Sequence, residues 1–289
     1  MMKKALAIDI GGTKIYHTII DENGTILEKI EKHSTPKDFN ELKSLIEKTI
    51  KTHENQVDAI AIATAGAVNN ENTGVISSTG NLVEGYSTLN FQTLSSKKVF
   101  VENDANAAAW AEHAIGASKN CPYSVMITLG TGVGGGIILD NKLYKGKSGA
   151  AGEMHFKMYP DKRRKCSCGT WDCFEAYASG TGLKITAEEM LCDKNVTTYD
   201  VINGMKDGCD NMKEVFDTWQ NHILTGLIGL ANLFDPDCFV LSGSMAEFVD
   251  TEYLKNGINS EIVTTPVNVY KATAGNHAGM VGVTLLALN

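Results

Sequence analysis

The sequence predicts an α/β fold, because short apolar strands alternate along the chain with segments of helical periodicity. A strand, a glycine turn and a second strand occur near the N-terminus, and the same plan recurs from residue 125. Two copies of one plan indicate an internally duplicated chain with two lobes.

The first copy begins at the N-terminus. Ala5–Ile10 is a continuous apolar strand, Gly11–Lys14 is a turn, and Ile15–Ile20 resumes as a strand. Asp21–Gly24 is a strong hairpin signal, so we expect a third strand at Thr25–Glu28.

The next elements complete the first half. They are a helix at Asn40–Thr52, strands at Val57–Ala63 and Val99–Glu102, and a helix at Ala105–Ile115. The second copy has a strand at Val125–Leu129, a turn at Gly130–Gly136 and a strand at Ile137–Leu139. A helix at Met212–Phe234, a strand at Phe239–Leu241 and a small-residue helix at Gly279–Leu288 close the chain.

We place the lobe boundary near residues 115–120. The N-terminal lobe is expected to span residues 1–117, with the C-terminal helix 279–289 packing back onto it. The C-terminal lobe then spans residues 118–278 and carries a cluster of cysteines.

The composition excludes several kinds of partner. Thirty-four acidic and 26 basic residues give a formal net charge of −8, which argues against nucleic acid or an anionic membrane. The apolar run Ala5–Ile10 stops at a glycine turn, so we interpret it as a strand and not a signal peptide. Seven cysteines, an odd number, argue against a secreted disulfide framework. We therefore expect a cytoplasmic protein.

Two glycine turns follow strands and suit an anionic ligand. In the first turn, Gly11 and Gly12 let backbone amides approach phosphate, and Thr13 and Lys14 add donors. The alternative is an ordinary tight hairpin. The second turn, Gly130–Gly136, holds five glycines in seven residues, which indicates close approach of something to the backbone. Together they predict phosphate held between the lobes. Neither turn has the spacing of a Walker loop.

Asp104 is the candidate general base. It follows the strand that ends near Glu102, in the first turn or cap of a helix. Phosphoryl transfer needs a carboxylate that receives the proton of the acceptor hydroxyl, while Mg²⁺ and amides neutralise the charge of the phosphates. The alternative is that Asn103 or Asp104 only caps the helix.

These motifs resemble the repressor, open reading frame, kinase (ROK) family in order and spacing, nearly from end to end. The matching segments are Asp9–Lys14, Glu102–Ala108, Gly130–Gly136, Ala151–Glu153 and Cys166–Glu175. The resemblance implies an actin-like (ribonuclease H-like), duplicated two-lobe fold with a cleft between the lobes. It also implies ATP, Mg²⁺, a sugar substrate and a homodimer.

The resemblance assigns roles to individual residues. Asp104 matches the catalytic base. The expected sugar-binding residues are Gly66, Asn81, Asn103, Asp104, Glu153, Glu175 and, as an open alternative, His155. The expected ATP-binding residues are Asp9, Gly11, Gly12, Thr13, Lys14, Gly130, Thr131, Gly132, Gly134, Gly135, Ser242, Gly243 and Gly279.

The cysteine cluster departs from the family pattern. The resemblance implies a closed structural zinc site made by one histidine with Cys166, Cys168 and Cys173. His155 stands one position early, and Phe156 occupies the position of the family's histidine. Along a strand this shift turns the side chain to the other face, so His155 completes the site only if the backbone bulges. The alternatives are a vestigial or three-cysteine site, or a His155 that faces the sugar.

The resemblance suggests 6-phosphorylation of an N-acetylhexosamine, with N-acetylmannosamine the best choice. Thr64-Ala65-Gly66 replaces the Pro-Gly turn common in glucokinases of the family, and Glu175–Gly180 is similar to N-acetylmannosamine kinases. Glucokinase is the second interpretation. A sugar-responsive repressor is a remote one, because such members carry a helix-turn-helix domain, whereas here the first strand begins at Ala5.

Overall fold

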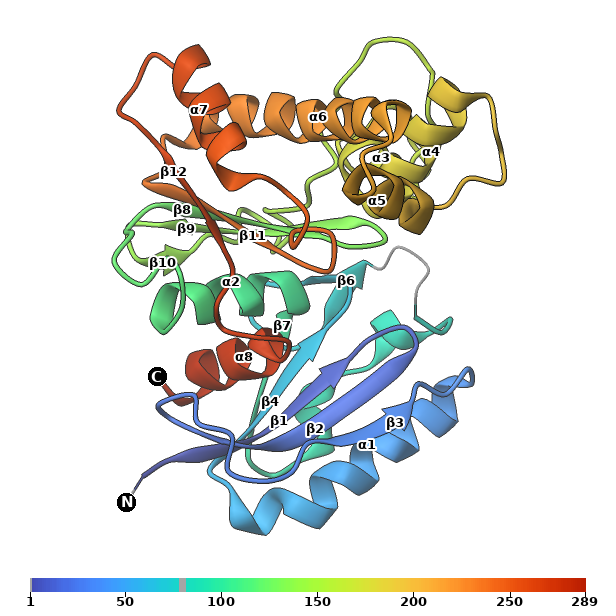
Figure 1. Cartoon of the computed structure of the whole chain (residues 1–289). Coiled ribbons are helices and arrows are strands. Elements are labelled where there is room, and N and C mark those ends of the chain that lie inside the picture. The colour runs from blue at the N-terminus through green and yellow to red at the C-terminus, as the bar shows by residue number, and fades with distance from the viewer. Residues whose placement is uncertain (1, 78–81) are drawn as a thin grey trace. The chain divides into compact units, whose positions relative to one another are not determined.

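The computed structural model describes residues 2–77 and 82–289 and contains two five-stranded sheets of matching topology (Figure 1). The first sheet has the order β3-β2-β1-β4-β7, and the second has the order β10-β9-β8-β11-β12. In each sheet the third, second and first strands in chain order are neighbours in that order. The fourth strand pairs with the free side of the first, and the fifth strand pairs with the fourth. This repetition confirms the predicted internal duplication.

The first sheet has mixed strand directions. Its strands are β1 (Lys4–Ile10), β2 (Lys14–Asp21), β3 (Glu31–Ser34), β4 (Ala59–Thr64) and β7 (Lys98–Asn103). β2 pairs antiparallel with both β1 and β3, whereas β4 pairs parallel with β1 and β7. A short hairpin of β5 (Ala67–Val68) and β6 (Val75–Ser77) lies outside the sheet.

The third strand was predicted too early. Thr25–Glu28 forms no strand; Ile26 makes only an isolated bridge to Ile20, and the edge strand is β3. The predicted turn is present, because Gly24 has a φ of 85° and donates its N–H to Asp21 O. After that turn the Thr18 hydroxyl donates to Glu28 O, so this stretch is held by a side chain in place of a full ladder.

Helices cover both faces of the first sheet (Figure 1). Helix α1 (Phe39–His53) packs its apolar stripe on one face. Helices α2 (Asp104–Ala114) and α8 (Ala278–Leu288) pack on the other face, which is rich in alanine. Short 3₁₀ turns occur at η1 (Glu54–Gln56), η2 (Tyr86–Thr88) and η3 (Phe91–Leu94).

The second sheet and its helices make up most of the second half. The strands are β8 (Ser124–Leu129), β9 (Val133–Leu139), β10 (Lys142–Leu143), β11 (Cys238–Ser242) and β12 (Asn268–Lys271). The helices are α3 (Glu175–Ala178), α4 (Gly180–Leu191), α5 (Thr198–Lys206), α6 (Asp210–Phe234) and α7 (Thr251–Glu261). The long helix α6 buries Phe216, Trp219 and Ile223, so its predicted apolar face belongs to a core.

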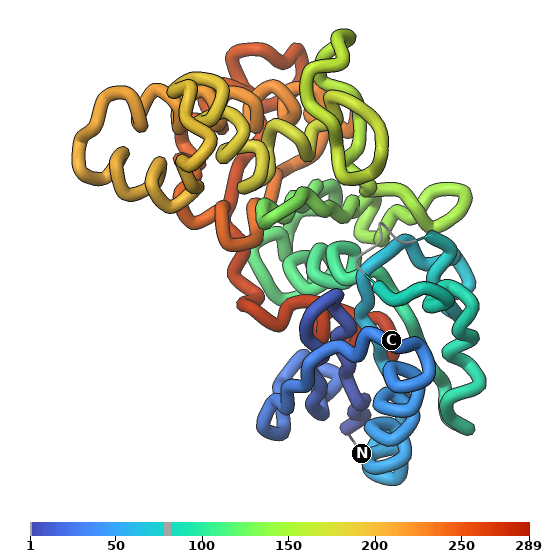
Figure 2. The backbone as a smooth tube through the Cα atoms, turned by 90° about the vertical axis from the view of Figure 1, so that its right-hand side faces the viewer, coloured from blue at the N-terminus to red at the C-terminus, as the bar shows by residue number. Residues whose placement is uncertain are grey.

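The chain divides into two compact units. Unit 1 comprises Met1–Asn120, Gly136–Gly152 and Thr273–Asn289, and unit 2 comprises Cys121–Gly135 and Glu153–Ala272. Figure 2 shows both chain ends in unit 1. Within the described ranges, each helix is too short or too polar to cross a lipid bilayer.

Gly282 lies at a close contact between α8 and α2. A Cβ placed on Gly282 would lie 1.7 Å from Ala107 O. Gly282→Ala is therefore expected to force the helices apart and lower the free energy of unfolding by about 3 kcal/mol. The matched control is Gly229→Ala on α6, where a Cβ meets no atom within 4 Å; it should stabilise by about 0.5–1 kcal/mol. Urea denaturation of both variants checks this, and equal effects would contradict the packing argument.

Candidate active site

The glycine turn after β1 directs backbone amides to one side. Gly11 N–H donates to Lys14 O at 3.0 Å and closes the turn. Gly11 O accepts from the Thr35 hydroxyl at 2.6 Å, and Gly12 O accepts from Lys37 Nζ at 2.9 Å. In a trans peptide the N–H points opposite to the C=O, so the amides of residues 12 and 13 point away from these partners. This is the polarity that a phosphate needs.

Asp9, at the end of β1, is a perturbed carboxyl group. Burial, followed by the charge of Asp104, raises the pKa of Asp9 to about 7. Both residues belong to unit 1, so the predicted turn and the predicted base lie close enough to interact. A cation bound beside Asp9 would favour its ionised form.

Asp9→Asn should change stability in a pH-dependent way. Between pH 4 and 7 the folded chain keeps a proton on Asp9 that the unfolded chain has lost, so stability falls as pH rises through this window. The asparagine side chain does not titrate, so the variant does not lose stability between pH 4 and 7 on this account. Discounted for partial exposure of Asp9, the variant should be more stable than the wild type by about 2 kcal/mol at pH 8 and equally stable near pH 4. Urea denaturation at both pH values checks this; equal stability at pH 8 would contradict it.

Asn103, and not Asp104, caps helix α2. Asn103 Oδ1 accepts from Asn106 N at 3.0 Å, and Asn103 Nδ2 donates to Gly66 O at 3.0 Å. Two predicted sugar-site residues are thus in contact. Asp104 is the first helical residue, and its Oδ1 accepts from Ala105 N at 2.8 Å. A carboxylate in the first turn is favoured by the helix dipole.

A buried ion pair beneath this helix start was missed from the sequence. Glu102 is 1% exposed, and its Oε2 lies 2.9 Å from Lys145 Nζ and accepts from Asn72 Nδ2 at 2.8 Å. Its Oε1 accepts from Asn103 N and from Asn106 Nδ2. The network therefore fixes the backbone that carries Asp104. The sequence does show a carboxylate, Glu102, near the end of an apolar strand. It does not show the partner of this carboxylate, because Lys145 lies 43 positions later in the chain.

The second glycine segment is a turn only as far as Gly132, because strand β9 begins at Val133, four residues before the predicted start of the strand. The segment is crowded mainly by the protein itself. A Cβ on Gly132 would lie 2.5 Å from Glu175 Oε2, and one on Gly135 would lie 2.4 Å from Met154 Cε. Gly134 N–H donates to Thr128 Oγ1, and Thr131 O accepts from the Thr181 hydroxyl. A Cβ on Gly130 meets nothing within 4 Å. Gly132 and Gly135 thus serve internal packing, whereas Gly130 has open space beside it.

Two expected ATP-binding residues, Ser242 and Gly243, lie beside this glycine turn in unit 2. Strands β8 and β11 pair in parallel up to Thr128 and Ser242, so their carboxyl ends share one edge of the sheet. Gly243 follows with a φ of 87°, and a Cβ there would lie 2.3 Å from Leu129 O. Gly279, on α8, instead lies in unit 1, where its Cβ would approach Asp104 O at 3.6 Å.

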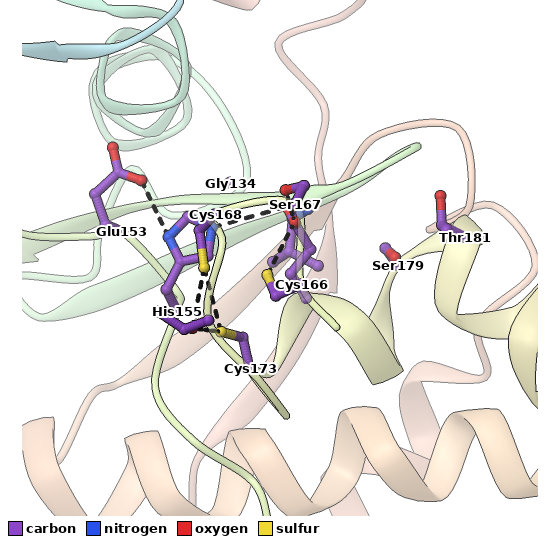
Figure 3. Close-up of polar contacts among 12 residues, drawn as sticks. Gly134, Glu153, His155, Cys166, Ser167, Cys168, Cys173, Ser179 and Thr181 are labelled. Atoms are coloured by element: carbon purple, nitrogen blue, oxygen red, sulfur yellow. Dashed lines mark hydrogen bonds and ion pairs between the residues drawn. The ribbon is translucent and has the colours of Figure 1, made fainter. Parts of the chain in front are cut away.

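His155 lies close to the cysteines despite its shifted position. Its segment is irregular rather than a strand, so the expected reversal of faces does not apply. One donor atom each of His155, Cys166 and Cys168 lies within 4.8 Å of the others, and Cys168 Sγ is 3.4 Å from Cys173 Sγ (Figure 3). Phe156 stacks on Phe174 with ring centroids 4.9 Å apart. The aromatic side chain thus joins apolar packing.

The thiol groups differ in acidity. Burial raises the pKa of Cys166 and of Cys173. Burial acts in the same direction on Cys168, but hydrogen bonds with Thr170, Cys166 and Cys173 together outweigh it and lower the pKa of Cys168 to about 7. Three sulfurs and an imidazole form a soft donor set that suits Zn²⁺.

The remaining predicted sugar residues of unit 2 gather around His155. Its Nδ1 lies 3.5 Å from Glu153 Oε2, and its Nε2 lies 3.9 Å from Glu175 Oε2 (Figure 3). Chiefly through the contact with Glu153, the pKa of His155 is raised. Glu175 Oε2 also accepts from Val133 N at 3.0 Å, which ties α3 to the glycine turn. Asn81 lies outside the described residues.

Comparison with known proteins shows the family of the chain. The model of the ROK family matches residues 5–289. A glucokinase of Streptomyces coelicolor is 34% identical, over 99% of this chain and 98% of its own length. An N-acetylmannosamine kinase of Yersinia pseudotuberculosis is 30% identical, over 99% of both chains.

A solved structure gives the same result for the fold. It is a ROK family glucokinase from Streptomyces griseus in complex with glucose and AMPPNP, 30% identical, with a TM-score of 0.78 over 100% of this chain and 99% of that one. ROK sugar kinases have the actin-like fold, so the predicted fold class is confirmed. The chain belongs to the ROK family.

Proposed function

We propose that this ROK sugar kinase transfers the terminal phosphate of ATP to the 6-hydroxyl of an N-acetylhexosamine, with N-acetylmannosamine as the preferred acceptor. The observation that carries the proposal is the arrangement around Asp104. Asn103 and the buried Glu102 fix the start of α2. The carboxylate of Asp104 interacts with Asp9 at the glycine turn. A base, a sugar-facing amide and an anion-binding turn are the parts that phosphoryl transfer to a sugar needs.

Asp104 acts as the general base. Its carboxylate accepts the proton of the sugar hydroxyl as the new O–P bond forms, and ADP leaves with the electron pair of the broken P–O bond. The amides of Gly12 and Thr13 bind the terminal phosphates, since their carbonyl groups are turned to Thr35 and Lys37. Asp9 is placed to hold Mg²⁺, which when bound neutralises phosphate charge.

The acceptor preference is proposed from the turn after β4. Ala65 donates its N–H to Ile10 O at 3.2 Å, and the Thr64 hydroxyl is bonded to the Tyr86 hydroxyl at 2.8 Å. A proline at position 65, as in a Pro-Gly turn, has no N–H to donate. The turn therefore has one hydrogen bond, from Ala65 N–H, that a Pro-Gly turn lacks. Gly66, the next residue, accepts a hydrogen bond from Asn103.

A coupled assay that follows ADP decides the acceptor. N-Acetylmannosamine, N-acetylglucosamine and glucose are compared at equal concentration, and the phosphorylated carbon is identified by NMR. We expect kcat/KM for N-acetylmannosamine to exceed that for glucose by at least about tenfold. Ala65→Pro should lower this ratio, whereas Ala65→Ser, which keeps the N–H, should preserve it. A preference for glucose would overturn the acceptor assignment and leave the sugar kinase intact.

We also propose that His155 and the three clustered cysteines hold a structural Zn²⁺. The support is the soft donor set and the short separations among the four side chains. Sulfur atoms this close repel when ionised, and a bound dication removes that repulsion. The ion would join the Cys166–Cys173 loop to the segment that carries Glu153.

A further inference from the structure

We propose a second metal site in unit 1, remote in sequence from the cysteine cluster, at which His17, Glu31 and His33 bind a transition-metal dication such as Zn²⁺. In the antiparallel ladder of β2 and β3, His17 is opposite Glu31 and Ile15 is opposite His33. Because side chains alternate along a strand, all three donors project from the same face of the sheet. The site spans two neighbouring strands and so depends on their register.

The donor atoms are already close together. Glu31 Oε2 lies 3.5 Å from His17 Nε2 and 4.0 Å from His33 Nε2. One donor atom of each residue lies within 4.8 Å of the others. Zinc binds nitrogen and oxygen at about 2.0–2.2 Å, so ligands of one ion lie roughly 3.3 Å apart. The Glu31 and His33 side chains are 60% and 38% exposed, so they have room to rotate toward one ion.

His17 is an unusual residue for its position. It lies on β2 between Ile15 and Ile19, on the face that α1 covers, and is 4% exposed. Its Nδ1 is buried and has no hydrogen-bond partner among the described residues. The ring atom that faces Glu31 is Nε2, so Nε2 is the atom that His17 offers to a metal. The proton of the neutral ring then lies on Nδ1.

Two further imidazole rings pack against His17. The rings of His17 and His33 are stacked with centroids 5.4 Å apart, and the His53 ring meets His17 edge-on at 5.3 Å.

His53, at the end of α1, adds a third imidazole to the cluster. Its Nδ1 lies 2.9 Å from Thr49 O, which accepts only from an N–H. In the neutral ring the lone pair is therefore on Nε2. Imidazoles with one carboxylate are typical ligands of zinc, nickel, copper and cobalt and not of Mg²⁺ or Ca²⁺. An ion here would fix the edge strand β3 to β2.

Zinc titration with metal analysis tests the site. Wild type and His33→Ala are compared with Lys32→Ala as the control. Lys32 is exposed and lies between Glu31 and His33 along β3, so its side chain projects from the opposite face of the sheet. We expect His33→Ala to lose one zinc per chain, or to bind it at least about tenfold more weakly. Lys32→Ala should bind as the wild type does. Glu31→Gln gives a second, surface-exposed variant with the same expected loss.

A Cys168→Ser background separates this site from the cysteine cluster. The difference between His33→Ala and Lys32→Ala should persist there. Cobalt bound at the histidine site should also lack the thiolate-to-cobalt charge-transfer absorption of a cysteine site. The proposal is overturned if wild type, His33→Ala and Glu31→Gln bind the same number of zinc ions with equal affinity, or if the difference disappears in the Cys168→Ser background.

Discussion

Asp104→Asn is expected to lower turnover by at least about 100-fold while sugar binding is retained. The amide oxygen can still accept from Ala105 N, which Asp104 Oδ1 does at 2.8 Å, so the first turn of α2 should keep its structure. The amide cannot take up the proton of the acceptor hydroxyl. Steady-state kinetics with the preferred sugar measures the loss, and calorimetric titration measures sugar binding.

The control for this variant is Asp58→Asn, also in unit 1. Asp58 accepts from Lys4 N at 2.9 Å at the surface, outside the proposed machinery. Asp58→Asn should leave kcat within about twofold of the wild type, because Asp58 lies outside the proposed machinery and surface substitutions change stability little. Near-normal turnover of Asp104→Asn, with its stability unchanged, would remove Asp104 from the role of base.

Lys145→Met is expected to lower the free energy of unfolding by about 3–5 kcal/mol. Lys145 Nζ is 2.9 Å from Glu102 Oε2, and the two side chains are 13% and 1% exposed. Methionine keeps most of the apolar stem but leaves the Glu102 carboxylate without its cation. A buried charge without a partner costs more than the pair contributes. Urea denaturation measures the change.

A double variant separates charge from packing. Glu102→Gln in the Lys145→Met background should recover most of the loss, since the amide carries no charge and can still accept from Asn103 N. Lys147→Met, an exposed lysine two positions away, should lie within about 0.5 kcal/mol of the wild type. If Lys145→Met and Lys147→Met have equal effects, Glu102 does not depend on the ion pair.

The parts of the fold set by local patterns could be predicted. The apolar run that forms β1, the helix that begins after Asn103 and the long helix α6 all lie within about two residues of expectation. The strand after Gly24 was placed too early, because a hairpin signal marks where a chain turns but not how soon pairing resumes.

The candidate site divides in the same way. The turn at Gly11 and the cap at Asn103 are local, so residue order reveals them. The pair of Glu102 with Lys145 and the histidine cluster join residues brought together by strand register and tertiary packing. The group that approaches Gly132 could not be predicted either, because Glu175, which occupies the space where a side chain would lie, is 43 positions later in the chain.

A crystal structure with N-acetylmannosamine and a non-hydrolysable ATP analogue tests the central claim most directly. The account predicts that the sugar 6-hydroxyl lies within hydrogen-bond distance, about 2.6–3.2 Å, of the Asp104 carboxylate. It also predicts terminal phosphates on the amides of Gly12 and Thr13. A sugar bound with its 6-hydroxyl turned away from Asp104, or phosphates bound away from that turn, would contradict it.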